Sequence, residues 1–167
     1  TSDGPLTAVV GELHNNGGEV SSLDSAAVTV ATLDNVAGLV TAGRALSLNV
    51  GALDNKGGLV TSQGFVSVAG NSLDNRQKGL IAGVGGVQVN ATTLDNRNGE
   101  LSSRAGVVFT GTQLDNSDGG LLIAGAGMGF SVIFGMDTVT GAAISAVIAI
   151  SIFVFNMYVF YRTKAMP

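Results

Sequence analysis

The sequence predicts an all-β fold, a parallel β-helix (β-solenoid) of about six 20-residue coils, followed by one hydrophobic C-terminal segment. Two observations carry this prediction. A Leu-Asp-Asn block recurs at a nearly constant interval, and the residues after each block alternate between apolar and polar. A unit of about 20 residues cannot bury its apolar face alone, so its copies must stack. The composition agrees, with 25 glycines for tight turns and no cysteine for a disulfide framework.

The block defines the coil. Its five copies begin at leucines spaced 20, 20, 21 and 20 residues apart, and a variant, Leu13-His14-Asn15, lies 20 residues before the first. We expect stacking to place equivalent residues about 4.8 Å apart. The block then gives an inward leucine column and an asparagine ladder, with the members Leu33, Asn35, Leu53, Asn55, Leu73, Asn75, Leu94, Asn96, Leu114 and Asn116. The alternative for asparagine is a local turn former, and one side chain can do both.

The second half of each repeat predicts a half-buried strand. In the third coil Leu46, Leu48 and Val50 alternate with Ser47 and Asn49, a period of two residues. No helical stripe persists within a repeat. A glycine follows most blocks five residues after the leucine, and we expect it to supply a positive φ in the turn.

The aspartates of the block present a difficulty. Stacked carboxylates about 4.8 Å apart would repel by about 1 kcal/mol per pair even in water, so we expect them to point outward or to accept turn N–H groups. A column of calcium ions is the alternative, but the glycine-rich pattern of calcium-binding solenoids is absent. Four arginines occupy what we interpret as scattered turn positions in solvated loops, namely Arg44, Arg76, Arg97 and Arg104.

The composition also excludes several classes of function. The net charge of −4 excludes a basic footprint for nucleic acid. The single histidine, His14, replaces the aspartate of a block, and we interpret it as a turn residue rather than a catalytic one. We therefore expect no catalytic residue, no metal and no cofactor. A carbohydrate-active β-helix enzyme remains an alternative, and it would need clustered carboxylates on one coil face.

The pattern Leu-Asp-Asn-x-x-Gly-x-Leu/Val on a 20-residue period resembles the haemagglutinin repeats of filamentous haemagglutinin-like adhesins. These are two-partner-secretion exoproteins of Gram-negative bacteria, and the stalks of contact-dependent growth-inhibition effectors are similar. The resemblance covers roughly residues 6–134. It implies a right-handed β-helix, export across both membranes through an outer-membrane β-barrel transporter, and display at the cell surface, where a host or neighbouring-cell receptor is the implied partner.

The composition changes near residue 137, so we expect two regions, a β-helix over 1–136 and a hydrophobic segment over 137–167. The last coil is expected over 120–134, with Leu121 in the inward position. Residues 139–161 carry no charge and are long enough to span a membrane, and Arg162 and Lys164 follow directly. The alternatives are an apolar cap docked on the end of the solenoid and a frameshift product without a selected role.

These features together predict a structural stalk fragment of a large bacterial surface or secreted adhesin, without catalysis. A membrane-anchored β-solenoid binding module is the second hypothesis. Residues 6–10 already alternate like the end of a coil and no signal peptide is recognisable, so we expect this sequence to be part of a longer open reading frame.

Overall fold

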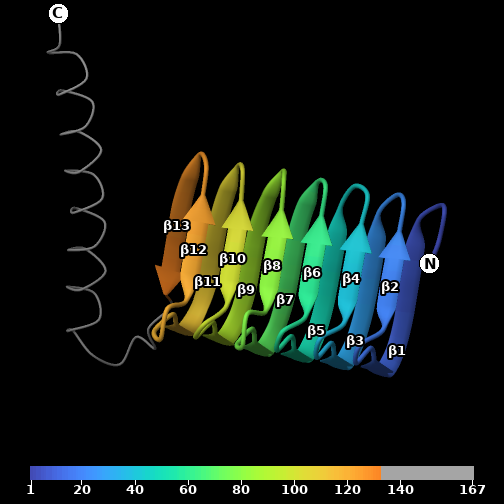
Figure 1. Cartoon of the computed structure of the whole chain (residues 1–167), viewed down its shortest axis with the longest axis horizontal. Coiled ribbons are helices and arrows are strands. Elements are labelled where there is room, and N and C mark those ends of the chain that lie inside the picture. Colours follow the sequence, from blue (N-terminus) through green and yellow to red (C-terminus); the bar gives the residue numbers. More distant parts are fainter. Residues whose placement is uncertain (133–167) are drawn as a thin grey trace, which may run out of the picture. The chain divides into compact units, whose positions relative to one another are not determined.

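The computed structural model is a parallel β-solenoid, in which the chain winds round one axis and each coil stacks on the one before it (Figure 1). The structure describes residues 1–132, and Thr1–Val132 form one compact unit. Within these residues there are thirteen strands and no helix. The predicted all-β parallel β-helix of about six coils is confirmed.

Each coil contributes a long and a short strand, which belong to two different parallel sheets. The seven-stranded sheet contains β1 (Leu6–His14), β3 (Ala26–Asp34), β5 (Leu46–Asp54), β7 (Phe65–Asp74), β9 (Gly86–Asp95), β11 (Gly106–Asp115) and β13 (Gly127–Val132) in that order. The six-stranded sheet contains β2 (Glu19–Ser22), β4 (Leu39–Ala42), β6 (Leu59–Ser62), β8 (Leu80–Gly83), β10 (Glu100–Ser103) and β12 (Leu121–Ala124).

The pairing register places equivalent residues of successive coils side by side. Leu33 of β3 pairs with Leu53 of β5, which pairs with Leu73 of β7. The register continues across the insertion between the fourth and fifth blocks, because Leu73 pairs with Leu94. Every block therefore occupies the same place in its coil, directly before the turn that connects a long strand to the next short strand.

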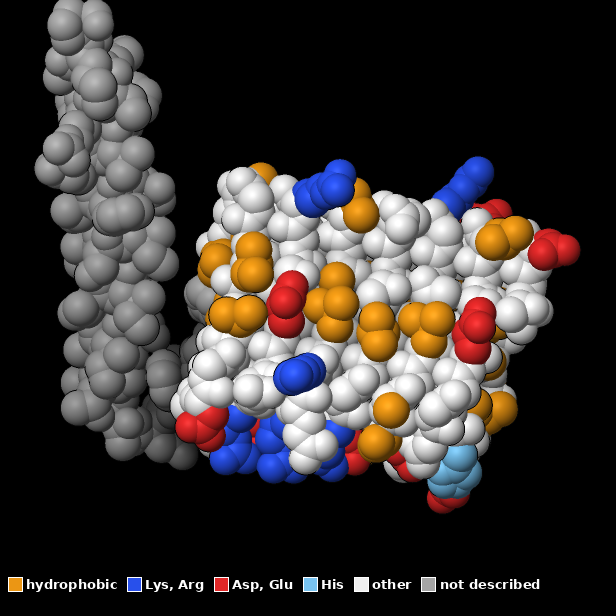
Figure 2. Space-filling model, in the orientation of Figure 1, with side chains coloured by type: hydrophobic (Ala, Val, Ile, Leu, Met, Phe, Trp, Pro, Cys, Tyr) orange, Lys and Arg blue, Asp and Glu red, His pale blue; other side chains and the backbone are white. Residues whose placement is uncertain are grey.

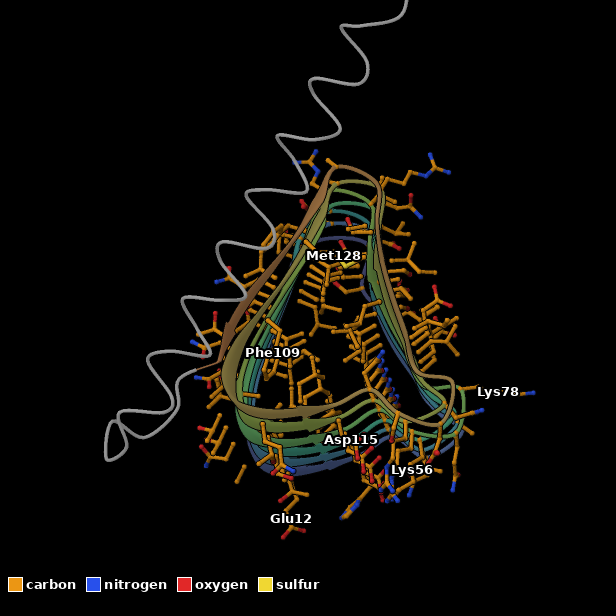
Figure 3. All side chains as sticks on the ribbon, turned by 90° about the vertical axis from the view of Figure 1, so that its left-hand side faces the viewer. Glu12, Lys56, Lys78, Phe109, Asp115 and Met128 are labelled. Carbon is orange, nitrogen blue, oxygen red and sulfur yellow. The ribbon has the colours of Figure 1, made fainter. Side chains whose placement is uncertain are left out.

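The core lies between the two sheets, which form the long sides of the coil in the view along the axis (Figure 3). The alternation expected from the sequence is present in β5, where Leu46, Leu48 and Val50 are buried and Ser47 and Asn49 are exposed. The block leucines form an inward column, and the four central ones, Leu33, Leu53, Leu73 and Leu94, are each at most 2% exposed. Burying a leucine side chain stabilises a fold by about 1.5–3 kcal/mol, so this column contributes substantially to stability.

The register of the last coil differs from the prediction. Leu122, not Leu121, pairs with the buried Leu101, so Leu122 takes the inward position and Leu121 is 49% exposed on the outside. The cause is an extra residue in the preceding turn, where Asp118 and Gly119 both have a positive φ. The turn of the fourth block, with positive φ at Gln77 and Lys78, has the same length.

The predicted hydrophobic segment at 139–161, its alternatives and the boundary at 136/137 lie outside the described residues. Among the described residues, no helix is long and apolar enough to cross a membrane.

Candidate functional site

The most regular feature of the molecule is the turn that follows each long strand. We call the six copies the turn stack, and it comprises residues 14–18, 34–38, 54–58, 74–79, 95–99 and 115–120. Each turn is tied to the next by its backbone, since the N–H of Asn35 donates to the carbonyl of Asp54 over 2.7 Å and the N–H of Asn55 to that of Asp74 over 2.7 Å. The stack runs along one corner of the coil, the corner at which Lys56 and Asp115, which belong to different coils, are both seen in the axial view (Figure 3).

The asparagine side chains of the turn stack are hydrogen bonded from coil to coil. Nδ2 of Asn55 donates to Oδ1 of Asn75 over 2.7 Å, and Oδ1 of Asn55 accepts from Nδ2 of Asn35 over 2.7 Å. The same bond links each successive asparagine from Asn15 to Asn116 over 2.6–2.7 Å. Asn35, Asn55, Asn75 and Asn96 are each 0% exposed, so these polar groups depend on one another for partners.

The same amides also close their own turns. Nδ2 of Asn55 donates to the carbonyl of Gly58, three residues on, over 3.2 Å, and to the carbonyl of Leu80 in the next coil over 3.3 Å. An asparagine at this position therefore forms hydrogen bonds both within its own turn and to the next coil. Any other side chain would leave at least one of these buried groups unpaired.

Glycine is required in the turns for a different reason from the one expected. The positive φ lies one residue earlier, at Gly17, Ala37, Gly57 and Asn98, and not at Gly18, Gly38, Gly58 and Gly99. At Gly38, Gly58 and Gly99 a Cβ atom would collide with the backbone carbonyl of the preceding coil's asparagine. Glycine is needed there because two turns approach too closely for any side chain.

The stacked aspartates are neutralised by a column of basic side chains that the sequence interpretation missed. Lys56 Nζ lies 2.6 Å from Asp54 Oδ2 of its own coil and 3.3 Å from Asp74 Oδ2 of the next. Arg76 likewise joins Asp74 to Asp95, and Arg97 joins Asp95 to Asp115, at 2.7 Å to the first partner and 3.4–3.5 Å to the second. We call this chain of seven side chains, from Asp54 to Asp115, the ionic ladder.

Arg76 and Arg97 lie in turns as predicted, but the prediction that they are scattered in solvated loops is wrong. Both occupy the same position as Lys56, two residues after the block aspartate. Their backbone N–H groups also donate to the aspartate Oδ1, which confirms that the carboxylates bind the turn. The recurring spacing Asp-Asn-Lys/Arg is the sequence signal that would have revealed the ladder.

The ladder shifts the acidity of its carboxyl groups. The hydrogen bonds from the Arg97 side chain lower the pKa of Asp95 below its ordinary value, against the opposing effect of partial burial. Burial raises the pKa of Asp74, but the bonds from Arg76 and Lys56 together outweigh it and leave the pKa of Asp74 lowered as well. These carboxylates therefore stay ionised in acid that would protonate an isolated aspartate.

The ionic ladder begins at Asp54 and does not extend back to Asp34 in the preceding coil. Val36 stands where Lys56 and Arg76 stand in later coils, so no basic side chain joins Asp34 to Asp54. Asp34 Oδ2 accepts instead from Asn16 Nδ2 over 2.6 Å, while its Oδ1 is buried without a partner. His14, which replaces the block aspartate in the first coil, is exposed. Its Nε2 lies 3.5 Å from Glu12 Oε2 and its Nδ1 lies 3.9 Å from Asp34 Oδ2.

The remaining surface of the described residues offers shallow grooves. One of about 380 Å³ lies on the six-stranded sheet between Thr61, Ser102 and Arg104, and one of about 520 Å³ lies on the seven-stranded sheet among Thr29, Asn49 and Asn90. Within residues 1–132 no group of three or more His, Cys, Asp or Glu side chains is placed to hold a metal ion.

A stack of equivalent coils, whose turns are joined by asparagines throughout and by ion pairs from Asp54 to Asp115, defines a β-solenoid repeat protein. The model of the haemagglutinin repeat family matches residues 1–70 and 65–129, and the chain belongs to this family. No curated protein and no solved structure matched it. The family and the β-solenoid together fit an adhesin-like structural stalk at the cell surface or in secreted form.

Proposed function

We propose that residues 1–132 are a segment of the stalk of a large bacterial surface adhesin and that they act by geometry rather than by catalysis. The observation that carries the proposal is the turn stack, in which asparagine side chains join every coil to the next and ion pairs reinforce the coils from Asp54 to Asp115. Such a chain of contacts resists both bending and slippage of the register, and these are the properties that a stalk needs.

The stalk extends in proportion to its number of coils. The seven long strands make six steps of about 4.8 Å, which gives about 29 Å of length from 132 residues. In the parent protein we propose two-partner secretion through an outer-membrane β-barrel transporter. The stalk would then hold a receptor-binding region away from a Gram-negative cell. The haemagglutinin repeat family supports this proposal, since it is a structural adhesin family.

Stiffness is testable with two spin labels on the full chain. Ala27 and Val108 are exposed in the same outward column of the seven-stranded sheet, four coils apart, and the chain has no native cysteine. The Ala27→Cys/Val108→Cys variant should give a narrow distribution centred at about 19 Å, with a width set by the label linkers. A broad distribution would contradict a rigid stalk.

Surface display is tested on intact producing cells. Gln63 is exposed in a loop, so Gln63→Cys should react with a membrane-impermeant maleimide, and the native chain supplies the unlabelled control. Labelling only after lysis would refute display at the surface.

A further inference from the structure

The outer face of the six-stranded sheet carries an apolar row that the stalk proposal does not use. The first residues of its strands pair from coil to coil in the order Glu19, Leu39, Leu59, Leu80, Glu100 and Leu121. We call these six residues the leucine row. Figure 2 shows it as a line of hydrophobic side chains across the face, with an acidic side chain at two positions. Leu59 is 41% exposed and Leu121 is 49% exposed.

The row differs from the outer face of the other sheet. The equivalent columns there are mainly polar, with Thr29, Asn49 and Asn90 in one and Ser47 and Ser67 in the next. Neither polar column needs a partner. The three consecutive leucines, Leu39, Leu59 and Leu80, form one aligned apolar strip on the sheet surface, and contiguous apolar exposure marks interaction sites.

The charges in the row limit what can cover it. Glu19 and Glu100 lie two coils before and two coils after Leu59, so they bracket the three consecutive leucines symmetrically. A second copy packed antiparallel about Leu59 would bury Leu39 on Leu80 but would place Glu19 opposite Glu100. Like charges so apposed disfavour this pairing. An anionic lipid surface would meet the same two carboxylates.

The spacing of the row suits a helix. Leucines repeat about every 4.8 Å along the solenoid axis, and an amphipathic helix presents one apolar side chain per turn of about 5.4 Å. Over three leucines the mismatch is only about 1 Å. Basic residues 14 positions apart on such a helix lie within about 40° of the same face and are about 21 Å apart, which is close to the roughly 19 Å between Glu19 and Glu100.

We propose that the leucine row binds an amphipathic helix of a partner protein, whose apolar stripe is flanked by Lys or Arg at both ends. The apolar side chains of the helix pack on Leu39, Leu59 and Leu80, and its basic side chains pair with Glu19 and Glu100. The neighbouring groove, with Thr61, Ser102 and Ile123 in its lining, accommodates side chains at one edge of the helix.

The test uses two synthetic helical peptides that share a three-leucine stripe and carry either Lys or Glu at two positions 14 residues apart, on the same face as the leucines. Fluorescence anisotropy against the full chain should show saturable binding of the Lys peptide and at least about tenfold weaker binding of the Glu peptide. The Glu19→Lys/Glu100→Lys variant should reverse this preference, which loss of folding could not produce. Leu59→Ser should weaken binding of the Lys peptide, and Val9→Ser, an exposed apolar residue of the other sheet, should leave it unchanged.

Several outcomes would overturn the proposal. They are equal binding of the two peptides, no binding of either, or binding that Leu59→Ser does not change. Binding of phosphatidylglycerol vesicles that Leu59→Ser abolishes would assign the row to a membrane instead. A dimer detected by sedimentation and lost in Leu59→Ser would assign it to a second copy. None of these outcomes bears on the stalk, whose spin-label distance is measured on the opposite sheet.

Discussion

Replacing Asn55 with alanine is the most direct test of the asparagine ladder. Asn55 is 0% exposed and lies in the middle of the stack, with hydrogen-bonded asparagines on both sides. The substitution leaves Asn75 Oδ1 without its 2.7 Å donor and removes the acceptor of Asn35 Nδ2, which keeps its longer bonds to the carbonyls of Gly38 and Leu59 at 3.3 Å. The damage is therefore one buried acceptor wholly unpaired and one buried donor partly unpaired.

The magnitude follows from these two groups. A buried polar group without a partner costs about 1–3 kcal/mol, so the two together lower the free energy of unfolding by about 3 kcal/mol. That is a large fraction of the stability of a typical domain, which is about 5–15 kcal/mol. Asn49→Ala is the matched control, because Asn49 is an exposed asparagine on the preceding strand and its loss should cost no more than about 0.5 kcal/mol.

Asn55→Asp tests specifically the hydrogen bond that the Asn55 side chain donates to the next asparagine of the ladder. A carboxylate keeps the acceptor for Asn35 but cannot donate to Asn75 Oδ1 at 2.7 Å, so it faces that oxygen with a negative charge. We expect Asn55→Asp to be less stable than Asn55→Ala at pH 7 and to recover at acidic pH, where the carboxyl group regains a proton to donate. Urea unfolding followed by circular dichroism measures all three variants. A loss below about 1 kcal/mol for Asn55→Ala, or equal losses for Asn55→Ala and Asn49→Ala, would refute the reasoning.

Three further predictions concern the turn stack. Gly58→Ala should destabilise the fold severely, because its Cβ would collide with the Asn35 carbonyl. Gly57→Ala, at a φ of 63° where a Cβ would make only an ordinary contact of 3.5 Å with the Gln77 carbonyl, should cost only about 1 kcal/mol; similar urea midpoints for the two variants would contradict the close-approach explanation. Because the folded-state pKa values of Asp74 and Asp95 are lowered, their contribution to stability is fully present above the unfolded value of about 4 and is lost as the pH falls through the folded values. Thermal melts between pH 7 and pH 2 should therefore show a smaller acid-induced loss in Asp74→Asn/Asp95→Asn than in the native chain, and parallel curves would argue against the ladder. Val36→Arg should extend the ionic ladder from Asp54 back to Asp34 and raise stability by about 0.5 kcal/mol in low salt, with the gain disappearing in 1 M NaCl; a gain that persists in salt would have another origin.

The period and the inward faces of the coils were accessible from the sequence because both depend on residues within one coil. Leu46, Leu48 and Val50 alternate with polar neighbours, and a strand with this alternation has only one way to place its apolar side chains inside. The 20-residue interval between blocks then specifies the stacking. The same reasoning failed in the last coil, where composition does not distinguish Leu121 from Leu122 as the inward residue.

The ionic ladder was missed because its members were judged one coil at a time. Arg76 and Asp74 are neighbours in the sequence, but the contact between Arg76 and Asp95 exists only because the turns are stacked. The glycine at position 58 was explained by a local rule for the same reason, whereas the cause lies in Asn35, 23 residues earlier.

The sequence by itself therefore determined the architecture, since a repeated apolar alternation with a constant interval allows no arrangement except a stack of coils. The tertiary structure alone decided which side chains of adjacent coils meet, and with what partners. The physical reason is that the strand spacing of about 4.8 Å brings residues 20 positions apart within hydrogen-bonding distance. Contacts on that scale depend on the length and path of each turn, and a single added residue, as in the turn at 115–120, shifts the residues that follow.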